Sequence, residues 1–407
     1  MFFLVILVLV GATSVYVFRR GAKVLGLERR GRFALAAALA IAPLMMVGSR
    51  ALASAGMNDA AYVLGVLGAT VVLGVLISTV LLWTVDLPFG AWAWIARWRR
   101  RDAPPRVTVT EDGVAHETEG ELAGPRTLGR REIIRQTATG AALSVGFGSA
   151  LYGSVFGRRD YQIVEVPVPI PGLSPRLDGY RIAQLSDIHF GVYIGEPELR
   201  SAVELVRSAR PDMVVLTGDL VDHDPAFAPR LGELVRRLEQ LHLRDGVIVI
   251  PGNHDYYAGI DAVLSAAEGG GGRVLRNSGR VIGDAGGAFA LVGVDDVWAP
   301  RNGYGPGADL GLALSMVPRD LPRILLCHNP EYFPEARGQV ALQLSGHTHA
   351  GQVNLGIRPA DFVLPYVEGL YLEEGSHLYV NRGFGTAGPP ARVGAPPEVT
   401  LVVLTAA

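Results

Sequence analysis

The stretch Leu344–Gly351 reads LSGHTHAG, and it places two of the chain's nine histidines one residue apart, directly after the largely apolar run Val340–Leu344. If that run is a buried strand, the residues after it enter a loop, where His347 and His349 can point the same way while Thr348 points the other. Two imidazoles on one side of a loop indicate a metal site. A His-x-His pair also occurs in ordinary surface loops, and zinc or iron sites need three or four ligands, so further ligands must come from elsewhere.

Four other apolar runs after residue 158 end in the same way, each followed by Asp, Asn or His. In α/β proteins ligands bind beyond the carboxyl ends of the strands, so we expect these distant residues to converge. The runs are Tyr180–Ser186 before Asp187 and His189, Met213–Thr217 before Asp219, Val247–Ile250 before Asn253, and Ile324–Cys327 before His328.

The residue types in this set favour particular metals. Mixed oxygen and imidazole ligands suit Mn, Fe or Zn better than Mg, which prefers oxygen ligands alone. Seven groups are too many for one ion, and they fit two ions about 3.5–4 Å apart that share a carboxylate, an arrangement that clamps a phosphoryl group. We therefore predict two divalent ions, Mn, Fe or Zn, bound by Asp187, His189, Asp219, Asn253, His328, His347 and His349.

The ordered motifs D-x-H, GD, GNHD, a single H and GHTH resemble those of the calcineurin-like metallophosphoesterases, over about residues 178 to 404. Three longer stretches, GNHDYYAG (252–259), GHTHAGQ (346–352) and RGFGTAGPPARVGAPPEVTLVVL (382–404), resemble a membrane-attached branch of that family. This branch is related to UDP-2,3-diacylglucosamine pyrophosphatase-like proteins and to transmembrane proteins with a metallophosphoesterase domain. The resemblance implies an α/β fold of the αββα type, in which two mixed β-sheets pack face to face with helices outside.

The same resemblance implies a role for each residue of the set. His254 stays free of metal and faces the phosphate, where it protonates the leaving oxygen or stabilises the developing charge. Asp255 is expected to hold the ring of His254 and to raise its pKa. His347 and His349 lie so close together because adjacent ions each take one of them. The first ion takes Asp187, His189 and His349, the second takes Asn253, His328 and His347, and Asp219 bridges the two.

The first 157 residues have the composition of a membrane region. The whole chain of 407 residues is 49% hydrophobic and only 19% charged, and its long uncharged segments all lie before residue 158. Each segment is near the roughly 20 residues that cross about 30 Å of hydrocarbon. We predict four transmembrane segments, at residues 1–18, 33–49, 61–85 and 136–157, followed by a catalytic domain at 158–407.

Basic residues set the expected orientation, because they favour the cytoplasmic side of a membrane. They cluster after the first segment and again in a predicted cytoplasmic linker at 97–135. Gly129–Arg135 resembles a twin-arginine export signal, and the alternative is an ordinary basic flank of a spanning helix. Both alternatives place the catalytic domain outside the cytoplasm, in a multi-pass protein of the plasma membrane.

We expect a membrane-anchored hydrolase of a phosphate ester or pyrophosphate, with a lipid or glycolipid such as a UDP-diacylglucosamine-type molecule as one candidate substrate. A soluble cyclic nucleotide is the main alternative, because the metal site does not distinguish what the phosphate carries. A non-catalytic membrane signalling protein that retains the fold is a further alternative. The net charge of −2 argues against a nucleic-acid partner, and the single cysteine, Cys327, excludes a disulfide within the chain.

Overall fold

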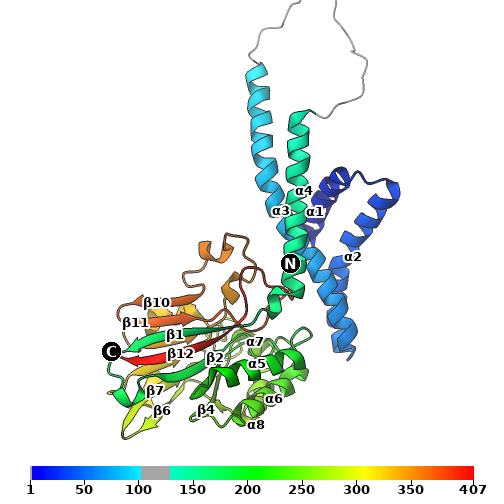
Figure 1. Cartoon of the computed structure of the whole chain (residues 1–407). Coiled ribbons are helices and arrows are strands. Elements are labelled where there is room, and N and C mark those ends of the chain that lie inside the picture. Colours follow the sequence, from blue (N-terminus) through cyan, green and yellow to red (C-terminus); the bar gives the residue numbers. More distant parts are fainter. Residues whose placement is uncertain (1, 102–128) are drawn as a thin grey trace, which may run out of the picture. The chain divides into compact units, whose positions relative to one another are not determined.

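The computed structural model describes residues 2–101 and 129–407 (Figure 1). The chain divides into two compact units. The helical unit comprises Met1–Val47 and Leu67–Leu151, and the sandwich unit comprises Gly48–Val66 and Tyr152–Ala407. The sandwich unit therefore includes a short segment, Gly48–Val66, that lies among the predicted membrane segments in the sequence.

All four predicted membrane segments overlap helices: 33–49 and 61–85 lie wholly within one, 136–157 extends two residues past the end of a helix, and residues 2–18 of the first segment are helical. Among the described residues, two helices, Arg29–Ser54 and Asn58–Ala91, are long and apolar enough to cross a membrane. Buried core helices and N-terminal signal sequences can meet the same criterion, so membrane insertion and the number of crossings stay predictions. The helices are α1 (Phe2–Val24), α2 (Arg29–Ser54), α3 (Asn58–Arg101) and α4 (Arg130–Val155).

The predicted linker at 97–135 overlaps two helices at its ends. Helix α3 continues to Arg101 and α4 begins at Arg130, so both ends of the predicted linker are helical. The rest of the linker, residues 102–128, lies outside the described residues.

Two six-stranded mixed sheets form the sandwich unit, as the αββα prediction requires. In spatial order, the first sheet contains β1 (Gln162–Ile170), β12 (Glu398–Ala406), β2 (Tyr180–Leu185), β3 (Met213–Thr217), β4 (Gly246–Ile250) and β5 (Arg273–Val274). The second sheet contains β10 (Gly369–Glu373), β11 (Ser376–Val380), β9 (Leu342–Ser345), β8 (Arg323–Leu326), β7 (Gly287–Gly293) and β6 (Ser278–Asp284).

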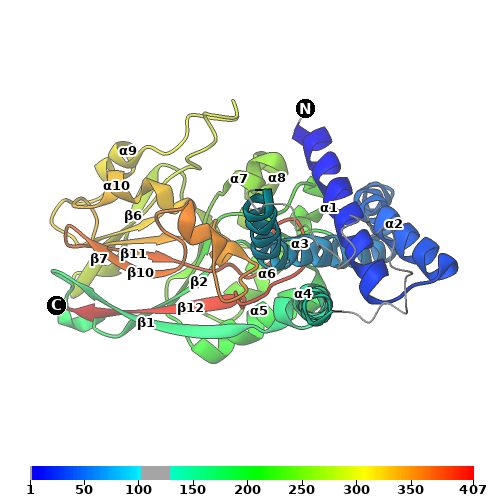
Figure 2. The ribbon, with the colours of Figure 1, turned by 90° about the horizontal axis from the view of Figure 1, so that it is seen from above.

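The inner strands β2, β3, β4, β8 and β9 are buried on both faces, which explains their almost continuous apolar sequences. In β3, Met213 and Val215 face the second sheet, whereas Val214 and Leu216 face the outer helices. Figure 2 shows α9 and α10 on one side of the paired sheets and α5 and α6 on the other. The predicted four-layer sandwich is confirmed. Its outer helices include α5 (Glu196–Ala209), α6 (Ala228–Glu239), α8 (Ile260–Gly269), α9 (Leu310–Ser315) and α10 (Phe333–Ala336).

The strand order brings the chemistry-bearing loops to one edge. Strands β2, β3 and β4 are parallel neighbours in the first sheet, and β7, β8 and β9 are parallel neighbours in the second. The amide of Gln184, buried near the end of β2, donates to the carbonyl of Ser345 at the end of β9 over 2.9 Å. The carboxyl ends of both sheets therefore meet where the metal motifs begin.

Candidate metal centre

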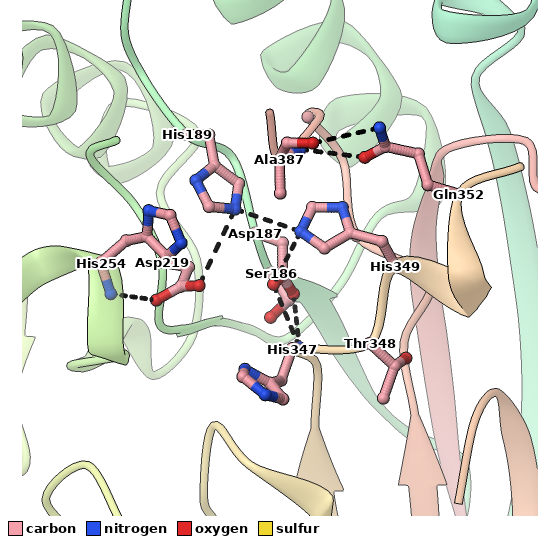
Figure 3. A network of polar contacts seen from close by, with 12 residues as sticks. Ser186, Asp187, His189, Asp219, His254, His347, Thr348, His349, Gln352 and Ala387 are labelled. Atoms are coloured by element: carbon pink, nitrogen blue, oxygen red, sulfur yellow. Dashed lines mark hydrogen bonds and ion pairs between the residues drawn. The ribbon is translucent and has the colours of Figure 1, made fainter. Parts of the chain in front are cut away.

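Six of the seven predicted metal ligands gather in two clusters at the carboxyl ends of β2, β3, β8 and β9. Figure 3 shows Asp187, His189, Asp219, His347 and His349. Within each cluster, the potential ligand atoms lie within 4.8 Å of one another. Asn253, the seventh, is the first residue of α7 (Asn253–Tyr257), which follows β4. The first cluster contains Asp187, His189 and His349, and the second contains Asp219, His328 and His347.

In the first cluster, two imidazole nitrogens face each other. His189 Nε2 lies 3.1 Å from His349 Nε2, which in turn lies 3.3 Å from Asp187 Oδ1. Two lone pairs at that distance repel, so a proton or a cation must lie between the rings. A divalent ion satisfies both nitrogens and the carboxylate together.

In the second cluster, the backbone fixes the orientation of a histidine. His328 Nδ1 lies 2.8 Å from the carbonyl of Thr217 and donates to it, so Nε2 is the nitrogen that faces the cluster. That Nε2 lies 3.2 Å from Asp219 Oδ2 and 3.3 Å from His347 Nδ1. This arrangement, with one ring nitrogen anchored on a carbonyl, is the one that metal-binding histidines commonly adopt.

Asp219 lies between the clusters. Its Oδ2 is 3.2 Å from His328 Nε2 in the second cluster and 3.8 Å from His189 Nε2 in the first. Its Oδ1 accepts a hydrogen bond of 2.8 Å from the backbone N–H of His254. One carboxylate oxygen therefore faces histidines of both clusters, while the other oxygen ties the carboxylate to α7.

The backbone is strained where the ligands leave the strands. Five of the six clustered residues have a positive φ, between 50° and 73°, a region that costs a non-glycine residue about 1–3 kcal/mol. The loop is held by the backbone N–H of His347, which donates to both carboxylate oxygens of Asp187 at 3.0 and 3.1 Å. A Cβ at Gly346 would lie 2.0 Å from Ser186 Oγ, so only glycine allows this close approach.

The residues present fit divalent metal ions. Asn253 Oδ1 is buried and has no hydrogen-bond partner among the described residues, and such an acceptor is costly unless another group uses it. Burial lowers the pKa of His347 and of His349 to about 4, so both rings are neutral at pH 7 and offer lone pairs. The protein therefore offers two neutral imidazoles, two further histidines, two carboxylates and an amide oxygen within one site.

Comparison with known proteins agrees with this geometry. The family model described as calcineurin-like phosphoesterase matches residues 180–351. The uncharacterized metallophosphoesterase YkuE of Bacillus subtilis is 32% identical over 234 residues, which cover 56% of this chain and 79% of that protein. The chain belongs to the metallophosphoesterase family.

Two vertebrate members of the family are also similar. Transmembrane proteins with a metallophosphoesterase domain from Danio rerio and Bos taurus are 35% and 33% identical to this chain, over 66% and 69% of its length. The matches cover 63% and 66% of those relatives, so the chain spans slightly less than two thirds of their length.

His254, predicted to face the phosphate, lies beside the clusters of this metallophosphoesterase. Its Nδ1 is 3.1 Å from the carbonyl oxygen of Asp222 and 3.3 Å from Asp222 Oδ1. Burial lowers the pKa of His254, but the carboxylates of Asp222 and Asp219 outweigh that effect and raise it to about 9. The ring is therefore a cation at neutral pH, and it keeps some contact with solvent, with 18% of the side chain exposed.

The prediction that Asp255 holds the ring of His254 is wrong. The carboxylate of Asp255 accepts three backbone N–H groups, from Leu220 and Val221 on one oxygen and Gly252 on the other, at 2.9–3.0 Å. His254 and Asp255 are neighbours on helix α7, and successive residues of a helix do not face each other. Asp255 therefore fixes the loop after β3, and Asp222 is the partner of the His254 ring.

Sequence reasoning missed two side chains that contact predicted ligands. Asp222 lies three residues after Asp219, and its Oδ1 is 3.6 Å from His189 Nδ1. Arg392 is buried, with 1% exposure, and its Nη2 lies 3.1 Å from His349 Nδ1. The Asp222-His223-Asp224 triplet was a usable signal for the first, whereas only the folded chain brings Arg392 next to His349.

Aromatic side chains surround the clusters. The Trp298 ring meets the ring of His347 edge-on, with centroids 4.6 Å apart. The Tyr257 ring lies 5.3 Å from that of His254 and 5.8 Å from that of His223. Aromatic rings therefore line part of the site.

Proposed function

We propose that this metallophosphoesterase hydrolyses a phosphate ester or a pyrophosphate with two bound divalent ions, Mn, Fe or Zn. The position of Asp219 carries the proposal: one of its oxygens lies 3.2 Å from a histidine of one cluster and 3.8 Å from a histidine of the other. A shared carboxylate between two ligand sets is what a pair of ions about 3.5–4 Å apart requires. Membership of the family supports the same reaction class.

The two clusters define the proposed ligand sets. Asp187, His189 and His349 hold one ion, Asn253, His328 and His347 hold the other, and Asp219 contributes to both. When bound, the ions supply positive charge that neutralises the phosphoryl oxygens and favours attack by a nucleophile.

His254 is the proposed proton donor. Its Nδ1–H is directed to Asp222, so Nε2–H is the donor that remains for the leaving oxygen of the substrate. The carboxylate of Asp222 keeps the ring protonated and fixes its orientation. Asp255 supports the site indirectly, because it holds the loop that carries Leu220, Val221 and Asp222.

The proposed substrate is an amphiphile at a membrane, such as a lipid or glycolipid pyrophosphate of the UDP-diacylglucosamine type. Two helices with the length and composition of membrane spans support this choice, as does the resemblance of the 252–259, 346–352 and 382–404 stretches to the membrane-attached branch of the family. A soluble cyclic nucleotide would suit the metal clusters equally well, so the test must include one.

The experiment uses the full chain purified in detergent. We expect about two metal ions per chain, loss of hydrolysis on chelation, and recovery with Mn, Fe or Zn. The substrate panel contains a lipid pyrophosphate, a phosphate monoester and a cyclic nucleotide. A protein that binds two ions and hydrolyses none of these compounds would be a binding or signalling protein. Preference for the cyclic nucleotide would overturn the choice of an amphiphile.

We also propose that the chain is an integral membrane protein with residues 158–407 outside the cytoplasm. Support comes from Tyr62, in the second turn of α3, whose hydroxyl accepts hydrogen bonds from Arg158 and Arg159. These contacts favour a position of the three residues on one side of the membrane. Helices α3 and α4 then both cross the membrane or neither crosses. A reporter active only outside the cytoplasm should work when fused after residue 160 and stay silent near residue 115; the reverse pattern would refute this topology.

A further inference from the structure

The end of α2, the start of α3 and the turn between them are part of the sandwich unit. This segment, Gly48–Val66, is called the hairpin tip below. The hydroxyl of Tyr62 in the tip accepts from the guanidinium groups of Arg158 and Arg159, the latter over 3.1 Å, and Arg158 also lies over the Tyr62 ring at 5.3 Å. Arg158 is 2% exposed, so the contact is a buried one. The hairpin tip therefore packs against residues that directly precede β1, in the unit that carries the metal clusters.

A second contact joins the hairpin tip to the loop that follows β2. The hydroxyl of Tyr193 lies 3.4 Å from Ser49 Oγ, and a Cβ at Gly65 would lie only 2.2 Å from that hydroxyl. Tyr193 is four residues after His189 in the chain. Arg230 of α6 holds this loop by donating to the carbonyls of Gly191 and Ile194 at 2.7 and 3.1 Å. The hairpin tip therefore packs on an ordered loop that begins at a predicted metal ligand.

A cavity of about 300 Å³ lies between the hairpin tip and the loops after β2 and β3. It adjoins the proposed proton donor, because His223 in its wall has its ring 4.7 Å from that of His254. The hairpin tip contributes Arg50, Ala53 and Ser54, and the loops contribute Gly191, Val192, Asp222, His223, Asp224, Pro225 and Phe227.

Arg50 is the unpaired charge of this cavity. Its side chain is exposed, and none of the described carboxylates forms an ion pair with it. The two acids across the cavity are already engaged: Asp222 with the rings of His189, His223 and His254, and Asp224 with the backbone N–H of Ala226. An arginine without an ion pair, in the lining of a cavity beside the proposed phosphate site, favours binding of a second anionic group, since guanidinium groups bind phosphate in a bidentate way.

We propose that the hairpin tip forms one wall of the substrate pocket and that Arg50 binds a second phosphate of a membrane-borne diphosphate amphiphile. The proposal rests on the phosphoesterase function proposed above and narrows its substrate class. Arg50, Ala53 and Ser54 end helix α2, whose preceding turns have the length and composition of a membrane span, so the pocket would open at the lipid surface.

The test compares Arg50→Gln with the wild-type full chain in phosphatidylcholine vesicles. The substrates are an alkyl diphosphate, the alkyl monophosphate of the same chain length, and a soluble nucleoside diphosphate. We expect Arg50→Gln to raise KM for the alkyl diphosphate about tenfold, without a matching change in kcat, because a binding contact is lost. KM for the monophosphate should change less than about twofold. Arg50→Lys should recover part of the lost affinity, since lysine keeps the positive charge but cannot form the two parallel hydrogen bonds of a guanidinium group.

The matched control is Arg30→Gln, which removes an exposed arginine from the other end of the same helix. It should leave all three substrates unaffected. Equal effects of Arg50→Gln on the diphosphate and the monophosphate, or no effect on either, would overturn the role of Arg50. Use of the soluble nucleoside diphosphate as efficiently as the alkyl diphosphate would overturn the membrane-borne source.

A binding measurement separates this proposal from the proposed function. The affinity for an alkyl methylenebisphosphonate, which cannot be hydrolysed, should fall about tenfold in Arg50→Gln. If the wild-type chain hydrolyses none of the substrates and this affinity still depends on Arg50, the proposed hydrolase function is wrong, but the assignment of Arg50 to a diphosphate-binding pocket is supported. If hydrolysis occurs and neither the KM for the alkyl diphosphate nor the affinity for the bisphosphonate depends on Arg50, the pocket assignment is wrong and the hydrolase function is supported.

Discussion

The internal contacts of the two units differ in kind. In the sandwich unit, the loops after the strands bury carboxylates and imidazoles on backbone of positive φ, as at Asp187 and Asp219. In the helical unit, α3 and α4 approach through small residues: a Cβ at Gly146 would lie 2.1 Å from Ser78 Oγ, and one at Gly74 would lie 2.5 Å from the ring of Phe147. Close approach through glycine is typical of helices that pack within a membrane.

This contrast predicts how substitutions will behave. Backbone strain and buried polar groups in the loops lower stability and persist because the site needs them, so changes there should affect chemistry before folding. Tight helix contacts carry no reactive group, so changes there should affect folding before chemistry. The predictions below are ordered from the largest expected effect on turnover to the smallest.

The largest effect is expected for Asp219→Ala. Its carboxylate faces both clusters, so its removal should release both ions and reduce turnover by at least about 10⁴-fold. Metal analysis of the purified variant and hydrolysis of a nitrophenyl phosphate provide the measurements. Asp320→Ala, at an exposed position, is the control and should keep full activity. Two tightly held ions in Asp219→Ala would rule out a shared ligand.

A smaller effect that depends on the leaving group is expected for His254→Asn. Both ions should stay bound, because the ring lies beside the clusters and bonds to Asp222 instead. Turnover of esters with poor leaving groups should fall about 10²–10⁴-fold, the usual contribution of a general acid, and a nitrophenyl ester should lose much less. His242→Asn, at an exposed turn, serves as control. Release of an ion would make His254 a ligand, and equal slowing of both esters would indicate charge stabilisation instead.

The metal-binding loops of the sandwich unit were the part of the molecule that the sequence predicted best. Each strand end carries its own polar residue, so the motifs after β2, β3, β4, β8 and β9 could be placed at one sheet edge before the fold was known. The pairing of His254 with Asp255 failed because adjacency in the chain was taken for adjacency of the side chains. Arg392 could not be predicted, because the loop that brings it 3.1 Å from His349 Nδ1 follows β11 and depends on the whole second sheet.

The surroundings of the N-terminal helices were harder to predict from the sequence. An apolar stretch has the same composition whether it lies in lipid or packs on protein, so the hairpin tip was assigned with the membrane segments. Its place in the sandwich unit depends on specific contacts of Tyr62 and Tyr193 that no hydropathy pattern encodes. Helix α4 was predicted to cross the membrane, yet it is not among the helices apolar enough to do so by composition alone.

A moderate, pH-dependent effect is expected for Asp222→Asn. The carboxylate raises the pKa of His254 to about 9, and without it the pKa should fall toward the ordinary value of about 6.5. A general acid must be protonated, so turnover is present below this pKa and is lost as the pH rises through it. The falling limb of kcat should therefore move to lower pH, with about tenfold less turnover at pH 8.

The control for this prediction is Asp224→Asn in the same loop. Asp224 accepts from the backbone N–H of Ala226, and its carboxylate forms an ion pair with none of the described histidines. Asparagine can make the same cap. Its pH profile should match that of the wild type. An unchanged falling limb in Asp222→Asn would mean that His254 is not the proton donor.

The smallest effect on turnover, and a clear effect on stability, is expected for Gly146→Ala in α4. The added Cβ would lie 2.1 Å from Ser78 Oγ and 2.7 Å from its backbone nitrogen, so α3 and α4 must separate locally. Gly148→Ala in the same helix is the matched control, because a Cβ there meets nothing within 4 Å. Both changes gain the same helix propensity, so the difference between the two free energies of unfolding isolates the contact, and we expect about 1–3 kcal/mol. Thermal unfolding in detergent measures this difference, and turnover of nitrophenyl phosphate should stay within about twofold of wild type in both variants. If Gly146→Ala lowered turnover as strongly as a loop substitution, the helix contact would be coupled to the metal site. The expectation that helix substitutions affect folding before chemistry would then be wrong.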